Sequence, residues 1–124
     1  MTNNHNKILG NYGEAAACVH LNDKGYTIRR RNYRCPDGEI DIIAELGHTL
    51  VFVEVKTRQT DDYGTPAEAI TSRKVEKIIQ IIKHYLAATD YSGILRVDAI
   101  EVYGTLKWGR FSVSKINHIE NIVN

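Results

Sequence analysis

The sequence lacks the features that disulfide-rich extracellular proteins, zinc-stabilised domains and membrane-spanning proteins require. Its two cysteines, Cys18 and Cys35, form no C-x-x-C pair and join no His/Cys cluster at zinc spacing, and the five histidines show no ligand spacing either. We therefore expect reduced thiols, without a disulfide framework or a structural zinc site. No apolar run approaches the roughly 18 residues of a membrane-spanning helix, and residues 1–7 lack the apolar segment of a signal peptide. These absences predict a cytoplasmic protein with no membrane partner.

What is present fits a globular domain. Hydrophobic residues make up 43% of the 124 residues and charged residues 25%, so the chain has enough apolar side chains for a core and is neither disordered nor collagen-like. A chain of this length is in the usual range of one domain, and we expect residues 1–124 to form a single unit.

Charge is unevenly distributed along the chain, although its sum is only +1. Basic runs lie at 29–34 and 73–83, and acidic residues fall between them. Basic runs on either side of carboxylates are suited to binding a polyanion together with a cation. Solvated faces are the ordinary alternative for such runs.

The predicted elements follow one another in the order of an α/β domain. We expect strands at 26–35, 39–45, 50–57, 94–103 and 110–113, and helical segments at 11–24, 65–68, 72–88 and 114–123. Short loops join the first three strands, whereas a long helix must cross over to the fourth. The sequence therefore predicts a mixed sheet with helices on both faces.

The second and third predicted strands each have an apolar side and a charged side. Strand periodicity puts Glu39 and Asp41 on one face of the second strand, and Glu54 and Lys56 on one face of the third. The opposite faces carry two apolar triplets, which are Ile40, Ile42 and Ala44, and Val51, Val53 and Val55.

A tight turn at Gly47 sets the register between these two strands. Counting outward from this turn, Asp41 falls directly opposite Glu54, and Glu39 opposite Lys56. Two like charges with Cβ atoms about 5 Å apart destabilise a sheet unless a cation neutralises them. Oxygen ligands on a hairpin suit Mg²⁺ or Mn²⁺, beside which Lys56 could hold or deprotonate a water. The alternative is a surface ion pair between Glu39 and Lys56, with Asp41 and Glu54 pointing into solvent.

Glu14 is a third acidic candidate. Its helical neighbours form a small and apolar stripe that should face the sheet, and these neighbours are Gly10, Ala17, Cys18 and Leu21. A carboxylate that faces inward needs a partner. The alternative is a role at the helix start, with Asn11 as the N-cap and Glu14 completing a capping-box-like pair.

Three segments together resemble the PD-(D/E)-x-K nuclease core, in the arrangement of archaeal Holliday-junction resolvases. They are the helical Gly13-Glu14, residues 38–44 with the sequence Gly-Glu-Ile-Asp-Ile-Ile-Ala, and Glu54-Val55-Lys56. Over nearly its whole length the chain resembles the YraN family of small bacterial proteins. That resemblance is carried by residues 10–14, 31–34, 51–58, 66–74 and 96–98.

The resemblance implies a restriction-endonuclease-like fold, a three-layer α/β/α arrangement around a central mixed sheet. It also implies that Asp41, Glu54 and Lys56 are catalytic, with Asp41 and Glu54 as metal ligands and Glu14 as an additional acidic ligand. Lys56 is then the positively charged partner of the attacking water. Ile40 stands where the nuclease motif has proline, a residue that contributes backbone shape and no ligand.

We therefore expect a nuclease that depends on Mg²⁺ or Mn²⁺ and acts on nucleic acid, with branched or structured DNA as the substrate. The candidate phosphate-binding side chains are Arg31, Arg34, Arg58, Arg73 and Lys74. For Lys74 a solvated helix position is the alternative. The alternative function is a nucleic-acid-binding adaptor that keeps the fold but does not cut.

A homodimer is a further expectation. Resolvases that cut symmetrically act as dimers, and the tail at 116–123 has enough apolar residues to contribute to an interface. The same residues could instead close the core. We assign no role to Trp108 or to the tyrosines, because aromatic residues in strands and helices are usually part of the core.

Overall fold

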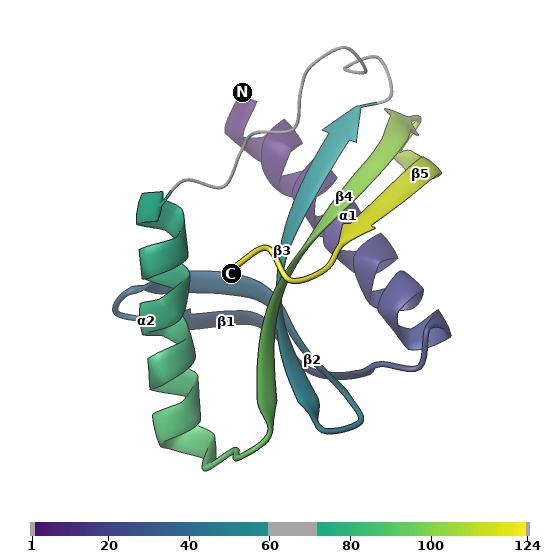
Figure 1. Ribbon diagram of the computed structural model, residues 1–124. Helices are drawn as coiled ribbons and strands as arrows, with labels where there is room; N and C mark the ends of the chain where they lie inside the picture. Colours follow the sequence, from purple (N-terminus) through teal and green to yellow (C-terminus); the bar gives the residue numbers. More distant parts are fainter. Residues whose placement is uncertain (1, 60–71, 124) are drawn as a thin grey trace.

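The computed structural model describes residues 2–59 and 72–123. Its elements are α1 (Thr2–Asp23), β1 (Thr27–Cys35), β2 (Gly38–Leu46), β3 (Thr49–Gln59), α2 (Ser72–Thr89), β4 (Ile94–Lys107) and β5 (Arg110–Ile119). The strands form one sheet in the order β1-β2-β3-β4-β5, and the two helices cover opposite sides of it (Figure 1). The expected three-layer α/β/α fold is confirmed.

The sheet is mixed, as predicted, because a helix separates β3 from β4. These two strands pair in parallel from Thr49–Ile94 to Gln59–Gly104. The other neighbouring strands pair antiparallel. A parallel pair needs a crossover connection, and α2 is part of it. The helical turn expected at 65–68 lies outside the described residues.

Both faces of the central strands are buried, each under one helix. The core under α1 consists of Ala17, Cys18, Leu21, Tyr26, Ile42, Ala44, Val51, Val53, Ile100 and Val102. The core under α2 consists of Ile40, Ile43, Leu50, Phe52, Ile78, Ile81, Ile82, Tyr85 and Val97. Neighbouring residues of β3 alternate between the two cores, as the two-residue period of a strand requires.

The alternation fails at one place on β2, between Ile40 and Ile42. Both were expected on one face, but Ile40 packs under α2 and Ile42 under α1. The β2–β3 pairing ends at Ile42–Val53, and beyond it the β1–β2 hairpin runs toward α2 (Figure 1). Because β2 leaves β3 at Asp41, the two-residue period does not carry across that point.

The tail is a strand and not the helix expected at 114–123. β5 pairs with β4 from Lys107–Arg110 to Ala99–Ile119, which satisfies backbone groups of β4 that would otherwise form an open edge. Ile116 packs against the core under α1, and Ile122 and Val123 pack against the core under α2. These apolar residues therefore help to close the core of their own chain.

A buried carboxylate fixes this tail to β4. Asp98 has no exposed surface, and it accepts hydrogen bonds from the Arg96 guanidinium, from His118 Nε2 at 2.8 Å and from the Asn121 N–H at 3.0 Å. Burial alone would raise the pKa of Asp98, but the hydrogen bonds from His118 and Arg96 outweigh it and lower the pKa. Asp98 therefore contributes to stability as a paired anion.

The turn between β4 and β5 carries the only tryptophan of the sequence. Trp108 is 100% exposed and adopts a left-handed backbone conformation with φ of 56°. The next residue, Gly109, accepts a 2.8 Å hydrogen bond from the Tyr12 hydroxyl of α1. None of the helices among residues 2–59 and 72–123 is long and apolar enough to cross a membrane.

Candidate active site

The candidate site lies where β2 and β3 separate. The predicted register holds from the turn to the Ile42–Val53 pair, but among the described residues the ladder contains no Asp41–Glu54 pair. Instead, the Val55 N–H donates a 2.8 Å hydrogen bond to Asp41 Oδ2. A side-chain oxygen thus takes the place of a strand carbonyl. This contact holds Asp41 between the strands rather than on a solvated face.

Three carboxyl groups, one each from α1, β2 and β3, lie around Asp41. Burial raises the pKa of Asp41 to about 7, and the charges of Glu54, Glu14 and Glu39 act in the same direction against one backbone hydrogen bond. Burial also raises the pKa of Glu14, whose carboxyl shares a hydrogen bond with Asp41. Burial and the neighbouring carboxylates therefore both disfavour the ionised forms of Asp41 and Glu14.

Glu14 reaches this cluster because α1 passes very close to β3. A Cβ atom added to Gly13 would overlap the Thr57 side chain, so only glycine allows this approach. The Glu14 side chain is 14% exposed, which agrees with the inward face predicted for it. The capping role is wrong, because α1 begins at Thr2 and Glu14 lies well inside the helix.

A lysine from α2 completes the cluster. Lys74 Nζ lies 3.0 Å from Glu54 Oε2, and the Glu54 side chain is only 12% exposed. Burial alone would lower the pKa of Lys74, but the hydrogen bond and charge of Glu54 outweigh it and raise the pKa. Lys74 also interacts with Lys56 and with the charge of Asp41. The solvated position considered for Lys74 is therefore wrong.

Polar side chains of β1 surround the acids on the other side. Arg31 Nη2 lies 3.9 Å from Glu14 Oε1. Arg34 Nε donates a 2.8 Å hydrogen bond to Glu39 Oε2, which replaces the Glu39–Lys56 ion pair considered above. With its amide oriented to donate, Asn32 is 2.9 Å from Glu14 Oε1 and 3.3 Å from Glu39 Oε1. Three of the four residues at positions 31–34 of β1 thus contact the acidic cluster or its flank.

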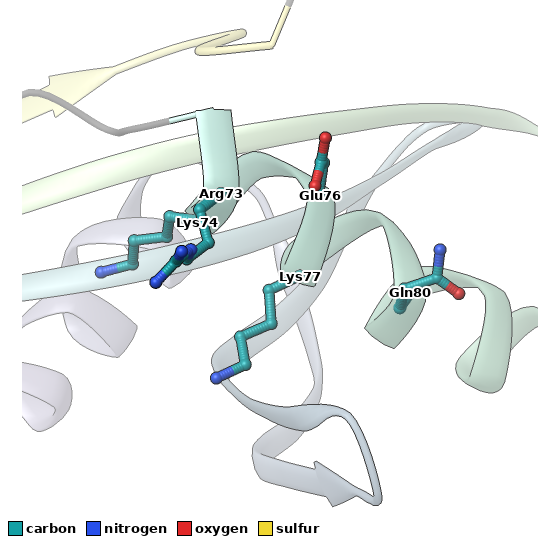
Figure 2. Close-up of a pocket in the computed structure, with 5 residues that line it drawn as sticks. All are labelled: Arg73, Lys74, Glu76, Lys77 and Gln80. Atoms are coloured by element: carbon teal, nitrogen blue, oxygen red, sulfur yellow. The ribbon is translucent and has the colours of Figure 1, made fainter.

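The remaining basic candidates lie at the ends of β3 and α2. The Nε of Arg58 is buried and has no hydrogen-bond partner within the part of the chain that the structure describes. Arg73 is exposed and lines an open pocket of about 590 Å³ together with Lys74, Glu76, Lys77 and Gln80. Figure 2 shows the Arg73, Lys74 and Lys77 side chains reaching to one side of α2, and Glu76 pointing away from them.

The structure brings together Glu14, Asp41, Glu54, Lys56 and Lys74, whereas Arg34 and Arg73 lie at the periphery. Sequence reasoning missed two contacts, those of Asn32 and of Lys74 with the acids. Counting back from the β1–β2 turn would have found the first, because the Arg31–Ile42 and Tyr33–Ile40 pairs set Asn32 across from Asp41. No local signal places the start of α2 beside Glu54.

Sequence comparison connects this site to a group of bacterial proteins. The model of the uncharacterised protein family UPF0102 matches residues 13–102, a segment that contains the acidic cluster and both lysines. A UPF0102 protein of Caldanaerobacter subterraneus is 41% identical over 116 residues, which cover 93% of each chain.

Two further relatives agree with this assignment. A UPF0102 protein of Clostridium acetobutylicum is 48% identical over 98 residues, 78% of this chain and 80% of its own. One from Caldicellulosiruptor saccharolyticus is 42% identical over 114 residues, 91% of this chain and 94% of its own. With the family model covering most of its length, the chain belongs to the UPF0102 family, which is the YraN family that its sequence motifs resemble.

Proposed function

We propose that this protein is a metal-dependent nuclease that hydrolyses phosphodiester bonds, with branched or structured DNA as its substrate. One observation carries the proposal. The carboxyls of Glu14, Asp41 and Glu54 come from α1, β2 and β3 and meet in a partly buried cluster beside Lys56. A domain that only bound nucleic acid would gain nothing from concentrating acids at the point where two strands separate.

The donor set of this cluster fits Mg²⁺ or Mn²⁺. Its candidate ligands, Glu14, Asp41 and Glu54, offer only carboxylate oxygens, which hard divalent cations prefer. Burial raises the pKa values of Asp41 and Glu14, and neighbouring carboxylates add to the effect, so a bound cation would favour the ionised form of both ligands. A bound cation would supply Lewis-acid polarisation of a phosphodiester oxygen and lower the pKa of a nearby water.

Side chains of the protein would then orient the attacking water, balance the charge of the ligands and hold the ligands in place. In the proposal, Lys56 orients the attacking water and stabilises negative charge that develops on the phosphate. Lys74 balances the charge of Glu54. Asn32 holds Glu14 through its amide.

Phosphates on either side of the scissile bond would contact the basic side chains around the cluster. Arg31 and Arg34 lie on β1, and Arg58 and Arg73 lie toward the ends of β3 and α2. Contacts of this kind make affinity strongly dependent on salt and give little base specificity. The proposal includes a cytoplasmic location and a homodimer, which would present two sites to the two strands of a symmetric junction.

Metal binding is the first test. We would titrate Mn²⁺ calorimetrically into the wild type and into the Asp41→Asn/Glu54→Gln double variant, with and without a four-way DNA junction. The expected result is saturable binding that the double variant loses. Glu45→Gln is the matched control, because Glu45 also lies on β2 but pairs with Arg29.

Cleavage is the second test. Labelled four-way junctions, duplex DNA, single-stranded DNA and RNA would be incubated with Mg²⁺, Mn²⁺ or EDTA. We expect metal-dependent cleavage of the junction that falls at least about 100-fold in Glu54→Gln and Lys56→Ala and is unchanged in Glu45→Gln. If no substrate is cut and Mn²⁺ does not bind, nuclease activity is refuted. Junction binding that persists without metal would then favour the adaptor.

A further inference from the structure

A second group of metal-ligating side chains lies at the end of the β1–β2 hairpin, away from the acidic cluster. Cys35 is the last residue of β1, Asp37 lies in the turn, and His84 lies on α2. One ligand atom from each, a sulfur, a carboxylate oxygen and an imidazole nitrogen, lie within 4.8 Å of one another. His84 Nε2 is already 2.8 Å from Asp37 Oδ2.

We propose that Cys35, Asp37 and His84 bind a transition-metal ion of the Zn²⁺ class, with water as the fourth ligand. Thiolate, imidazole and carboxylate are together a borderline-soft donor set, which favours Zn²⁺ or Co²⁺ over Mg²⁺. At bond lengths of roughly 2.0–2.3 Å, tetrahedral ligand atoms lie about 3.3–3.7 Å apart. Small side-chain rotations therefore suffice to close this group around an ion.

Proton balance follows from the contacts. Cys35 must lose its thiol proton to bind as thiolate, and His84 must bind as neutral imidazole through the nitrogen that now faces Asp37. The ion replaces the hydrogen bond between Asp37 and His84. Binding therefore releases protons to the solvent.

The backbone around the three ligands is already fixed. The pairing of Cys35 with Gly38 leaves two residues, Pro36 and Asp37, in the turn. The Cys35 side chain packs against the core under α2. Two ligands from the end of one hairpin and one from an adjoining helix therefore need no rearrangement of the chain to meet an ion.

Aromatic packing holds the hairpin and the helix together next to these ligands. The rings of Tyr33 on β1 and Tyr85 on α2 meet edge to face with centroids 5.3 Å apart. Tyr85 directly follows His84 in the sequence. A bound ion would add a second link between the same two elements and fix the position of α2, the helix that carries Lys74.

This proposal opposes the expectation that the chain has no structural zinc site. That expectation rested on the spacing of cysteines and histidines, and spacing rules detect ligands that are close in sequence. His84 lies far along the chain from Cys35 and comes beside it only because α2 packs on the hairpin. The proposal does not depend on the proposed nuclease function.

The test uses Co²⁺ as a spectroscopic probe on the full-length protein after treatment with EDTA. We expect one equivalent to produce a thiolate-to-cobalt charge-transfer band in the near ultraviolet and the intense visible bands of tetrahedral cobalt, and added Zn²⁺ to remove both. Cys35→Ser should abolish the charge-transfer band. Cys18→Ser is the matched control, because Cys18 lies on α1 in the core on the other face of the sheet and its loss should leave the band unchanged.

Two further variants separate this site from the acidic cluster. His84→Gln changes a partly exposed side chain, so the variant should fold, and we expect it to weaken Co²⁺ binding at least about 10-fold. Asp41→Asn/Glu54→Gln should keep the cobalt spectrum. A spectrum without a thiolate band, or a band that survives in Cys35→Ser or disappears in the double variant, would overturn the proposal.

Discussion

The charge of Asp41 should lower the stability of the metal-free protein, and Asp41→Asn removes that charge with little change of shape. The asparagine oxygen can accept the hydrogen bond from the Val55 N–H, and its NH₂ group can donate to Glu14. The pKa of Asp41 rises from an ordinary 3.8 to about 7 in the folded protein. Each unit of pKa corresponds to about 1.4 kcal/mol, so ionising Asp41 lowers the free energy of unfolding by up to about 4 kcal/mol.

The sign of the pH dependence follows from proton binding. The folded state holds the Asp41 proton more tightly than the unfolded chain does, so stability falls as pH rises from about 4 to about 7. Asp41→Asn should therefore be more stable than the wild type by up to about 4 kcal/mol at about pH 8. The difference in the free energy of unfolding should shrink below about 1 kcal/mol near pH 4, because the wild-type Asp41 is then protonated in the folded protein and as neutral as the asparagine of the variant.

Urea unfolding followed by circular dichroism measures this difference. The wild type, Asp41→Asn and Glu45→Gln would be compared in EDTA between about pH 4 and about pH 8. In thermal unfolding at about pH 8, the melting temperature of Asp41→Asn should exceed that of the wild type by on the order of 10 °C. Mn²⁺ should stabilise the wild type more than the variant. If Asp41→Asn is no more stable than the wild type at about pH 8, or if the difference is the same at every pH, the reasoning about the buried carboxylates is wrong.

Three further substitutions test other contacts. Gly13→Ala should destabilise the protein by about 1–3 kcal/mol in thermal unfolding, because the added Cβ atom overlaps the Thr57 side chain of β3. Gly10→Ala is the control: the space around Gly10 is open, so this variant should be neutral or stabilising by up to about 1 kcal/mol. Lys74→Met should tighten Mn²⁺ binding about 10-fold in calorimetry, since it removes the cation that competes for Glu54, and weaker binding would contradict this view. Asp98→Asn should cost about 3 kcal/mol in urea unfolding at neutral pH, and the loss should fade below about pH 4, where the wild-type carboxyl is protonated in the unfolded chain.

The parts of the fold that follow from local patterns could be predicted from the sequence. The turn at Gly47 sets the β2–β3 register as far as the Ile42–Val53 pair, because alternation and turn geometry act over few residues. The same rule failed at Ile40, because a side-chain contact from Asp41 interrupts the ladder there. That contact depends on the position at which β2 separates from β3, and the spacing of apolar residues does not predict that position.

Elements whose state depends on distant partners could not be predicted. The tail has apolar residues at spacings that fit a helix, but pairing with the exposed edge of β4 makes it a strand. The inward position of Glu14 was predictable from its small and apolar neighbours on the helix. The ion pair between Lys74 and Glu54 was not predictable, since it depends on how a crossover connection brings α2 back over the sheet.

The full exposure of Trp108 determines what intrinsic fluorescence can report. Its indole ring is surrounded by water in the folded protein, so its emission should resemble that of an unfolded chain and change little on denaturation. Tyrosine signals from the buried Tyr26 and Tyr85 are better reporters of unfolding. The tryptophan fluorescence therefore reports only on the surroundings of the β4–β5 turn. Quenching on addition of DNA would show that bases stack at this hairpin, without interference from changes in the core.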